Sequence, residues 1–322
     1  MAKAPPRQAF RTLVLRTLPG VMQAPFPGFI EPMQPTQHAK LPAGTQWQYE
    51  IKLDGWRGQL HLRNGAAKIF SRNGNDLTAQ CATITAAAAD LQATSAVLDG
   101  EIVVPGRNGI PNFLELRSAM TRGQSRLLFY AFDLVHLDGY DLRAASLADR
   151  RGLLAQLLAG SPGGRILMSE TIDIQEPPAL LFRHACELGM EGIVAKRADS
   201  PYRSGRVQSW VKVKCVRQLA LPIIGYVPQK GNSIAAIRLG RHDGRELVYA
   251  GKAGTGFTVK SAQSVRARLL PLHRKTPPLA KPLKRPDTIW VEPRVIADIA
   301  FTELTEDGML RHASFKGLKD DV

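Results

Sequence analysis

Residues 47–214 contain many short β-rich runs, only a few helical segments and no regular strand–helix–strand repeat. A parallel sheet needs crossover helices between its strands, so this pattern favours an antiparallel α+β domain. Alternating or continuous apolar residues predict strands at 47–53, 59–63, 67–70, 96–104, 127–135, 193–196 and 210–214. Helices are predicted at 77–91, at 146–158 with a capping signal from Ser146 and Asp149, and at 177–188, which Gly189 ends.

The pattern changes after Lys214. Strand-like runs at 219–227, 233–239, 246–251, 288–291 and 295–304 are separated by Gly-containing turns, and one helical run lies at 257–270. Five short strands with one helix fit a small closed barrel such as an OB-fold. We therefore expect a basic N-terminal arm at 1–30, an α+β domain at 31–216 and an OB-fold barrel at 217–322.

The chain is strongly basic, with 43 Lys and Arg residues against 28 Asp and Glu residues and a net charge of +15. This balance favours a polyanionic partner such as nucleic acid. Residues 262–286 hold seven basic residues, five prolines and no acidic residue, which predicts an exposed loop in their second half. Lys281, Lys284 and Arg285 of that loop either contact a phosphate backbone or belong to an ordinary solvated surface.

Composition excludes several classes of protein. With 44% hydrophobic and 22% charged residues the chain is not wholly disordered, and no run approaches the roughly 20 apolar residues that span a bilayer. The three cysteines are widely spaced, suggest neither a disulfide framework nor a zinc site, and favour a reducing compartment. The arm carries four basic residues, five prolines and no acidic residue, which is typical of a flexible segment and also resembles an organellar transit peptide.

Two segments carry lysines in positions that suit chemistry. The segment 50–57, Glu-Ile-Lys-Leu-Asp-Gly-Trp-Arg, places Lys52 in an apolar strand just before a Gly turn. A lysine held there can act as a nucleophile when burial or nearby positive charge lowers its pKa, and a surface lysine at a hairpin end is the alternative. In 210–214 the period of two puts Lys212 and Lys214 on one face, which suits a triphosphate or a solvent-facing strand edge.

Six short motifs follow one another along the chain. After 50–57 come Ser-Arg-Asn-Gly at 71–74, Leu-Asp-Gly-Glu at 98–101, Tyr-Ala-Phe-Asp at 130–133, Glu-Gly-Ile-Val-Ala-Lys at 191–196 and Trp-Val-Lys-Val-Lys at 210–214. Together they resemble the motif series of the covalent nucleotidyltransferases, the superfamily of ATP-dependent DNA ligases, RNA ligases and mRNA-capping enzymes.

Two further segments narrow the resemblance. The Gly-rich segment 250–257 lacks the G-K-[ST] ending of a phosphate-binding loop. This segment and the tail at 310–321 resemble instead the barrel of bacterial end-joining-type ATP-dependent DNA ligases. Ala313 and Lys319 depart from that pattern, because proline and arginine are usual at these positions.

The resemblance implies a role for individual residues. Lys52 would attack the α-phosphate of ATP, and Lys212 and Lys214 would contact that phosphate. The remaining nucleotide-binding residues would be Glu50 near the adenine amino group, Ile51, Arg57 and Glu101 at the ribose, and Phe132 stacked on the adenine. Glu191 and Asp54 would hold Mg²⁺ or Mn²⁺, and Arg72 and Arg206 would bind DNA together with the basic loop. Arg311, Lys316 and Lys319 of the tail would orient the leaving pyrophosphate as the tail swings over the nucleotide pocket.

The function implied is that of an ATP-dependent DNA ligase, which seals 5′-phosphate/3′-hydroxyl nicks through a lysyl-AMP and an adenylylated DNA end. The resemblance spans residues 28–321, which predicts a stand-alone core ligase. The partners expected are ATP, nicked duplex DNA and end-joining or repair proteins, for a monomer in the bacterial cytoplasm at the nucleoid. The alternatives are an RNA ligase or capping-type nucleotidyltransferase and, in another class, a non-catalytic DNA-binding protein on the same fold.

Overall fold

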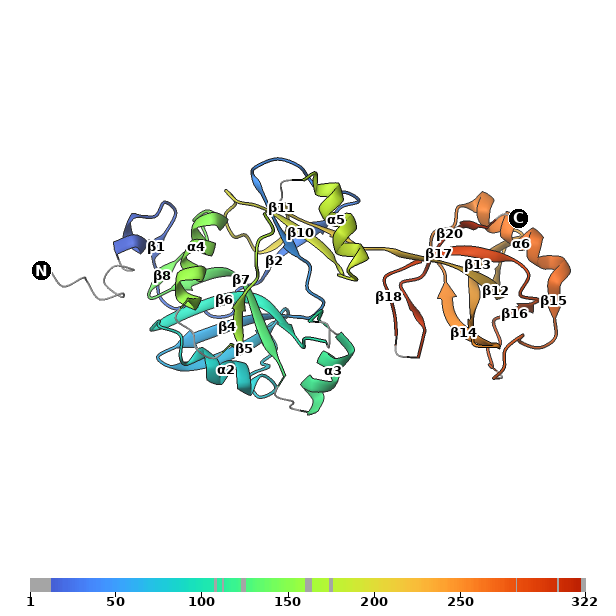
Figure 1. Ribbon diagram of the computed structural model, residues 1–322, viewed down its shortest axis with the longest axis horizontal. Coiled ribbons are helices and arrows are strands. Elements are labelled where there is room, and N and C mark those ends of the chain that lie inside the picture. The colour runs from blue at the N-terminus through green and yellow to red at the C-terminus, as the bar shows by residue number, and fades with distance from the viewer. Residues whose placement is uncertain are drawn as a thin grey trace, which may run out of the picture. The chain divides into compact units, whose positions relative to one another are not determined.

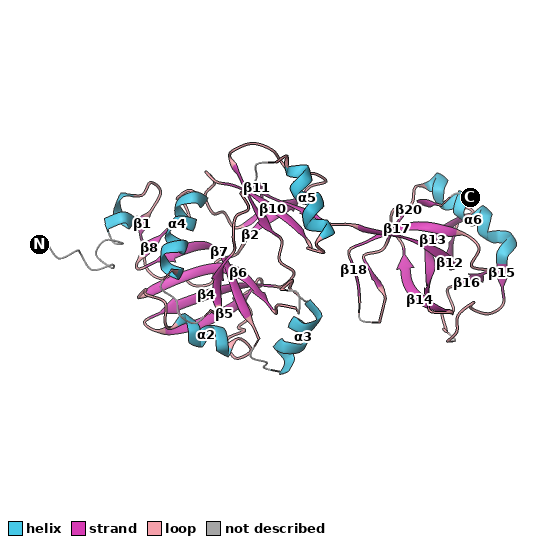
Figure 2. Ribbon diagram, viewed as in Figure 1, coloured by secondary structure: helices cyan, strands magenta, loops and turns pink. Residues whose placement is uncertain are grey.

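The computed structural model describes residues 13–319 except 107–108, 112, 123–125, 160–163, 174–175, 282 and 306. The chain divides into two compact units, Met1–Lys214 and Cys215–Val322 (Figure 1). Strands dominate both units, and the described helices are short (Figure 2).

The first unit contains a seven-stranded sheet in the order β1-β8-β7-β6-β4-β5, with β9 paired to β7. Its strand pairs are antiparallel except the pair of β7 and β9, so the predicted antiparallel α+β class is confirmed. The strands are β1 (Met22–Gln23), β4 (Trp56–Arg63), β5 (Ala66–Ser71), β6 (Ser95–Val103), β7 (Leu128–Leu137), β8 (Tyr140–Asp141) and β9 (Ile166–Met168).

A second sheet of this unit has the order β2-β11-β10-β3. On one of its faces Tyr49, Ile193 and Ala195 pack against Ala185 of helix α5. The period of two along each strand therefore turns the intervening side chains, which include the candidate site, to the opposite face. The elements are β2 (Met33–Gln37), β3 (Trp47–Ile51), β10 (Gly192–Arg197), β11 (Gly205–Lys214) and α5 (Pro178–Glu187).

A buried cluster joins the opposite face to the seven-stranded sheet. Met33 of β2 and Trp210 of β11 pack there with Val97 of β6 and Phe132 of β7. The rings of Phe132 and Trp210 meet edge to face at 5.9 Å. The candidate site consequently lies between two sheets, on rigid elements rather than on loops.

The helices and sheet edges differ from the prediction in several places. The helix predicted at 77–91 forms only as α2 (Ala82–Ala88), because the Leu77 amide donates to the Ile69 carbonyl of β5 at 2.8 Å. The strand predicted at 47–53 ends at Ile51, so Lys52 follows it. Ser146 caps α4 (Leu147–Leu158) by accepting from the Asp149 amide, as predicted. In the first unit, the described elements that were not predicted are α3 (Phe113–Arg122), β1, β2, β8 and β9.

The second unit is an OB-like barrel. Its long strand β12 pairs with β13, β16 and β17, and β17 pairs with β20. A bridge between Thr255, which follows β14, and Ser314 of β20 closes the barrel. Helix α6 (Val259–Leu269) begins with a capping box of Thr258 and Ser261. The other elements are β12 (Arg217–Gln229), β13 (Ser233–Asp243), β14 (Glu246–Ala253), β15 (His273–Arg274), β16 (Ile289–Val291), β17 (Ile296–Phe301), β18 (Glu303–Leu304), β19 (Leu310–Arg311) and β20 (Ser314–Leu318).

Candidate active site

Strand register places the candidate residues in rows across the four-stranded sheet. On β10, Val194 lies opposite Glu50 of β3 on one side and Lys212 of β11 on the other. Two residues further along β10, Lys196 lies opposite Trp210. One face of the sheet therefore carries a carboxylate, two lysines and an indole within two adjacent rows.

Lys52 lies at the other end of this face. Its amide donates to the Gly192 carbonyl at 2.9 Å, and Gly192 lies opposite Lys214. Glycine is needed at 192 because a Cβ would lie 2.1 Å from the Val213 carbonyl oxygen. The Lys52 ammonium contacts one oxygen of Glu191, and the other oxygen lies 2.9 Å from Lys214 Nζ. Glu191 thus bridges the candidate nucleophile and one of the two lysines predicted to face phosphate.

Positive charge is concentrated around Lys212. Burial lowers the pKa of Lys212, and the neighbouring charges of Lys52, Lys214 and Arg206 lower it further, against an opposing effect of Glu191. Like charges held this close repel one another unless an anion lies among them. This end of the face is therefore suited to bind phosphate.

The opposite wall of the site comes from the seven-stranded sheet. Arg57 of β4 lies opposite Glu101 of β6. The Arg57 guanidinium donates to both oxygens of Asp99 at 2.6 Å and to the Met33 carbonyl at 3.0 Å. Its central carbon also lies 4.4 Å from the centre of the Phe132 ring. Arg57 is therefore fixed by a carboxylate that the sequence analysis did not assign to the site.

Glu101 is half-buried beside these charges. Burial raises its pKa to about 7, although the positive charges of Arg57 and Lys52 act in the opposite direction. A carboxyl group with such a pKa exchanges its proton near neutral pH. Together with Arg57 it can both donate and accept hydrogen bonds, as the hydroxyls of a ribose require.

A second buried cluster surrounds Glu50. Its carboxylate accepts from Arg151 at 3.0 Å and from the Ser169 hydroxyl at 2.8 Å. Lys196 Nζ lies 2.7 Å from Glu50 and 4.2 Å from the centre of the Phe132 ring. Burial lowers the pKa of Lys196 to about 8, against the opposing effect of Glu50. The sequence analysis missed this cluster: Lys196 stood in a recognised motif, whereas Arg151 and Ser169 carried no sequence signal.

The residues of both walls line one cavity. Ile51, Leu53 and Pro35 complete it beside the charged and aromatic groups. Of the residues predicted to bind nucleotide, the structure brings to this cavity Glu50, Ile51, Lys52, Arg57, Glu101 and Phe132.

Glu191 and Asp54 were expected to hold a divalent cation. Among the residues that the structure describes, no group of three or more His, Cys, Asp and Glu side chains could hold a metal ion. The Glu191 carboxylate contacts two lysines. One carboxylate suits a Mg²⁺ ion whose other ligands are water and substrate phosphate, so these residues fit an ion that arrives with a triphosphate.

The residues predicted to bind DNA lie outside this cavity. Arg72 follows β5, is exposed and donates to the Gln34 side chain at 2.6 Å. Arg206 is exposed on β11. In the second unit Lys281, Lys284 and Arg285 are exposed and lie between regular elements, as predicted for this loop.

The end of the basic loop is anchored to the barrel by the buried Arg238. Its guanidinium donates to both oxygens of Asp287 at 3.0 Å, to the Thr288 hydroxyl at 3.1 Å and to the Tyr249 hydroxyl at 3.0 Å. The loop therefore leaves the barrel from a fixed point, two residues after Arg285.

The tail is part of the barrel. Arg311 ends β19, and Lys316 lies in β20, which pairs with β17. Phe315 is buried and stacks on Phe257 at 4.5 Å, and the Lys319 amide donates to a β17 carbonyl at 2.9 Å. An independent swing of the tail, as expected from the sequence, would break these contacts.

A two-sheet domain with a lysine at the end of β3, followed by an OB-like barrel, is the arrangement of a covalent nucleotidyltransferase. Residues 31–214 match the family model of the ATP dependent DNA ligase domain, and residues 230–322 match that of the ATP dependent DNA ligase C terminal region. The chain therefore belongs to the ATP-dependent DNA ligase family.

Curated relatives include two bacterial proteins named multifunctional non-homologous end joining protein LigD. The protein of Pseudomonas aeruginosa is 37% identical over 308 residues, which cover 93% of this chain and 36% of the relative. That of Mycolicibacterium smegmatis is 34% identical over 283 residues, which cover 86% of this chain and 36% of the relative. The chain thus spans about a third of the length of these relatives.

Solved structures agree with this assignment. The ligase domain of M. tuberculosis LigD is 33% identical, with a TM-score of 0.54 over 90% of this chain and 95% of that one. Mycobacterial DNA ligase D complexed with ATP and MES is 32% identical, with a TM-score of 0.55 over the same shares. The α+β fold with a C-terminal OB-like region is that of a DNA ligase, as predicted.

The structure bears on the membrane spans and on the cysteines that were considered from composition. No helix among the described residues is long and apolar enough to cross a membrane. Cys81 is a free, buried thiol, whereas Cys186 and Cys215 are disulfide-bonded, so the interpretation of the cysteine spacing was wrong for these two.

Proposed function

We propose that this protein seals nicks in duplex DNA with ATP, by way of a covalent Lys52–AMP intermediate. The observation that carries the proposal is the position of Lys52 at the end of a sheet face that also bears Lys212 and Lys214. Arg57 and Glu101 face them from the other sheet. Membership of the DNA ligase family favours DNA over RNA as the nucleic acid joined.

In the first step the Lys52 side chain loses its proton and its nitrogen attacks the α-phosphorus of ATP. A nitrogen–phosphorus bond forms, the bond to the bridging oxygen breaks, and pyrophosphate leaves. Lys212 and Lys214 offset the negative charge on the α-phosphate, which is the main contribution a protein makes to phosphoryl transfer. Lys52 must first exchange its contact with Glu191 for one with the phosphate.

The base is held at the other end of the same face. Glu50 can accept from the adenine amino group, Lys196 forms an ion pair with Glu50, and Phe132 provides an aromatic surface. A Mg²⁺ ion held by Glu191, Asp54 and the phosphates would supply further charge neutralisation.

In the second step an oxygen of the DNA 5′-phosphate displaces Lys52 from phosphorus and takes the AMP. In the third the 3′-hydroxyl attacks that 5′-phosphate, the phosphodiester forms and AMP leaves. Arg72, Arg206 and the basic loop would hold the DNA backbone during both steps. Arg311, Lys316 and Lys319 would serve the first step, orienting pyrophosphate.

We propose for this chain the setting that its relatives' names print, which is non-homologous end joining. We also propose that it acts in the bacterial cytoplasm, at the nucleoid, as a monomer that meets end-joining or repair proteins. The names of two LigD relatives support the pathway, which the site itself does not specify.

Intact-mass measurement after incubation with ATP and Mg²⁺ tests the intermediate. We expect one AMP adduct on the unmodified protein, an equal adduct on Lys40→Ala, whose lysine is exposed, and none on Lys52→Ala. An adduct that persists in Lys52→Ala would refute the mechanism. Sealing of a nicked duplex with a DNA or an RNA acceptor strand then separates a DNA ligase from an RNA ligase. A protein that binds DNA without any adduct would be the non-catalytic alternative.

A further inference from the structure

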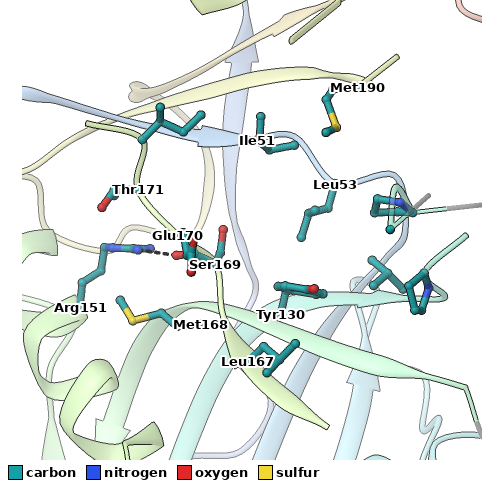
Figure 3. Close-up of a pocket in the computed structure, with 15 residues that line it drawn as sticks. Ile51, Leu53, Tyr130, Arg151, Leu167, Met168, Ser169, Glu170, Thr171 and Met190 are labelled. Carbon is teal, nitrogen blue, oxygen red and sulfur yellow. Dashed lines mark hydrogen bonds between the residues drawn. The ribbon is translucent and has the colours of Figure 1, made fainter. Parts of the chain in front are cut away.

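A second, larger cavity adjoins the candidate nucleotide cavity. It has a volume of about 940 Å³, compared with about 90 Å³ for the cavity between the two sheets. Ile51, Leu53 and Ser169 line both of them. Ile51 belongs to β3, the edge strand of its sheet, so the two cavities meet at that edge. Figure 3 shows Ile51 and Leu53 at the second cavity.

The walls of this second cavity are mainly apolar. Leu167 and Met168 of β9, Met190 and Tyr130 surround it together with Leu53 (Figure 3). Methionine side chains are flexible and make favourable contacts with aromatic rings. Such walls suit a flat apolar group, in a volume typical of small-molecule sites.

Of the charged groups that line it, Glu170 is exposed and Arg151 is already engaged. Arg151 donates to Glu50 and to the Ser169 carbonyl, the second contact being the one drawn in Figure 3. In the described part of the chain no lysine lines this cavity, so it differs sharply from the phosphate end of the site. The cavity therefore offers little for a phosphate.

The junction of the two cavities lies at the base end of the nucleotide site. Ser169, which lines both, donates to Glu50 at 2.8 Å, and Glu50 is the group expected at the adenine amino position. Lys212 and Lys214 line neither cavity in the described residues. A nucleotide held by its phosphates at those lysines would thus present its base, not its triphosphate, to the second cavity.

We propose that the second cavity is a binding site for an aromatic group carried on the base of an adenine nucleotide. The proposal rests on the proposed function, because the nucleotide must be anchored at Lys52 for its base to reach the junction. The site would therefore accept base-substituted ATP analogues as adenylyl donors, and aromatic adenosine derivatives as competitors of ATP.

Two ATP analogues test the proposal, one with a benzyl group on N6 and one with a phenylethyl group at C2. Formation of the nucleotide adduct is followed by intact mass, with ATP in parallel. We expect at least one analogue to label the protein at a rate within about tenfold of ATP, since an apolar pocket that fits the group offsets its bulk.

Substitutions in the cavity assign the effect to it. Met168→Trp fills the space and should reduce labelling by that analogue more than about tenfold while labelling by ATP changes less than about threefold. Met168→Leu is the matched control and should retain labelling both by ATP and by the analogue. Met190→Trp provides a second filling variant, and thermal denaturation shows that each variant is folded.

Three results bear on the proposal in different ways. Rejection of both analogues by a protein that ATP labels would overturn it. Equal loss of ATP and analogue labelling in folded Met168→Trp and Met190→Trp would overturn it as well. Absence of labelling by ATP itself would instead refute the proposed function, on which the site depends.

Discussion

Replacing Asp99 by asparagine should destabilise the first unit by removing a buried negative charge. Asp99 is fully buried and receives three hydrogen bonds of 2.6 Å, two from Arg57 and one from the Tyr202 hydroxyl. Asparagine has nearly the same shape as aspartate, but an NH₂ group replaces one carboxylate oxygen and then faces a hydrogen-bond donor. Arg57 would then remain as a cation without its carboxylate, and the geometry that presents it to the nucleotide would be lost.

The magnitude follows from the burial of the pair. Breaking a buried ion pair costs about 3–5 kcal/mol, and Arg57 retains its bond to the Met33 carbonyl and its contact with Phe132. We therefore expect the free energy of unfolding to fall by about 3 kcal/mol. With a urea dependence of about 2 kcal/mol per molar, the midpoint of unfolding should fall by about 1.5 M.

Tryptophan fluorescence can follow the first unit alone. Trp47, Trp56 and Trp210 lie in that unit and Trp290 in the other, so a Trp290→Phe background removes the second signal. Urea titrations of Asp99→Asn in this background give the midpoint. Labelling by ATP in the absence of urea should also require a higher ATP concentration.

An exposed pair of the same geometry provides the control. Arg197 donates through Nε and Nη2 to the two oxygens of Asp199, at 3.0 and 2.6 Å, but both side chains are largely exposed. Asp199→Asn should cost less than about 1 kcal/mol. If Asp99→Asn shifts the midpoint no further than Asp199→Asn, the reasoning from burial is wrong.

Two further predictions concern stability in acid and DNA binding. Burial lowers the pKa of His61 to about 4, so between pH 6.5 and 4 the unfolded chain binds more protons, and the free energy of unfolding should decrease as the pH is lowered through this range. Urea midpoints measured against pH should show a flatter dependence in His61→Gln, and an unchanged slope would contradict this. Arg238→Met removes the anchor at Asp287 and should weaken binding of nicked DNA and make its dependence on salt shallower, measured by fluorescence anisotropy. Labelling by ATP should change less than about twofold in this variant, and an unchanged salt slope would indicate that the anchor does not position the loop.

The sequence was sufficient to predict those features of the site that depend on the local geometry of a strand or on the order of the motifs. The alternation in 210–214 is sufficient to place Lys212 and Lys214 on one face, and the order of the motifs identified Lys52. The face toward which they point could not be predicted, because it depends on α5 covering the other one.

The partners that fix the site were harder to predict. Arg57 and Asp99 are 42 residues apart, and Arg151 and Glu50 are 101 residues apart. Pairs of this kind arise from strand register and from the packing of α4, which a single sequence does not reveal. The same limit explains why the helix predicted at 77–91 is shorter than expected. The residues at its start favour a helix by composition, but the Leu77 amide hydrogen-bonds to β5 instead.

The tail shows how tertiary contacts change an interpretation based on motifs. The resemblance implied a tail that swings over the nucleotide pocket, yet Phe315 lies in the barrel core and the strand β20 completes the barrel wall. Freeing the tail would expose Phe315 and break the pairing with β17, at a cost of several kcal/mol. A role for Lys316 in adenylylation of Lys52 would therefore involve the intact barrel, not a tail released from it. Phe315→Ala should then lower the stability of the barrel and the rate of Lys52 labelling together, whereas Lys316→Ala should lower only the rate.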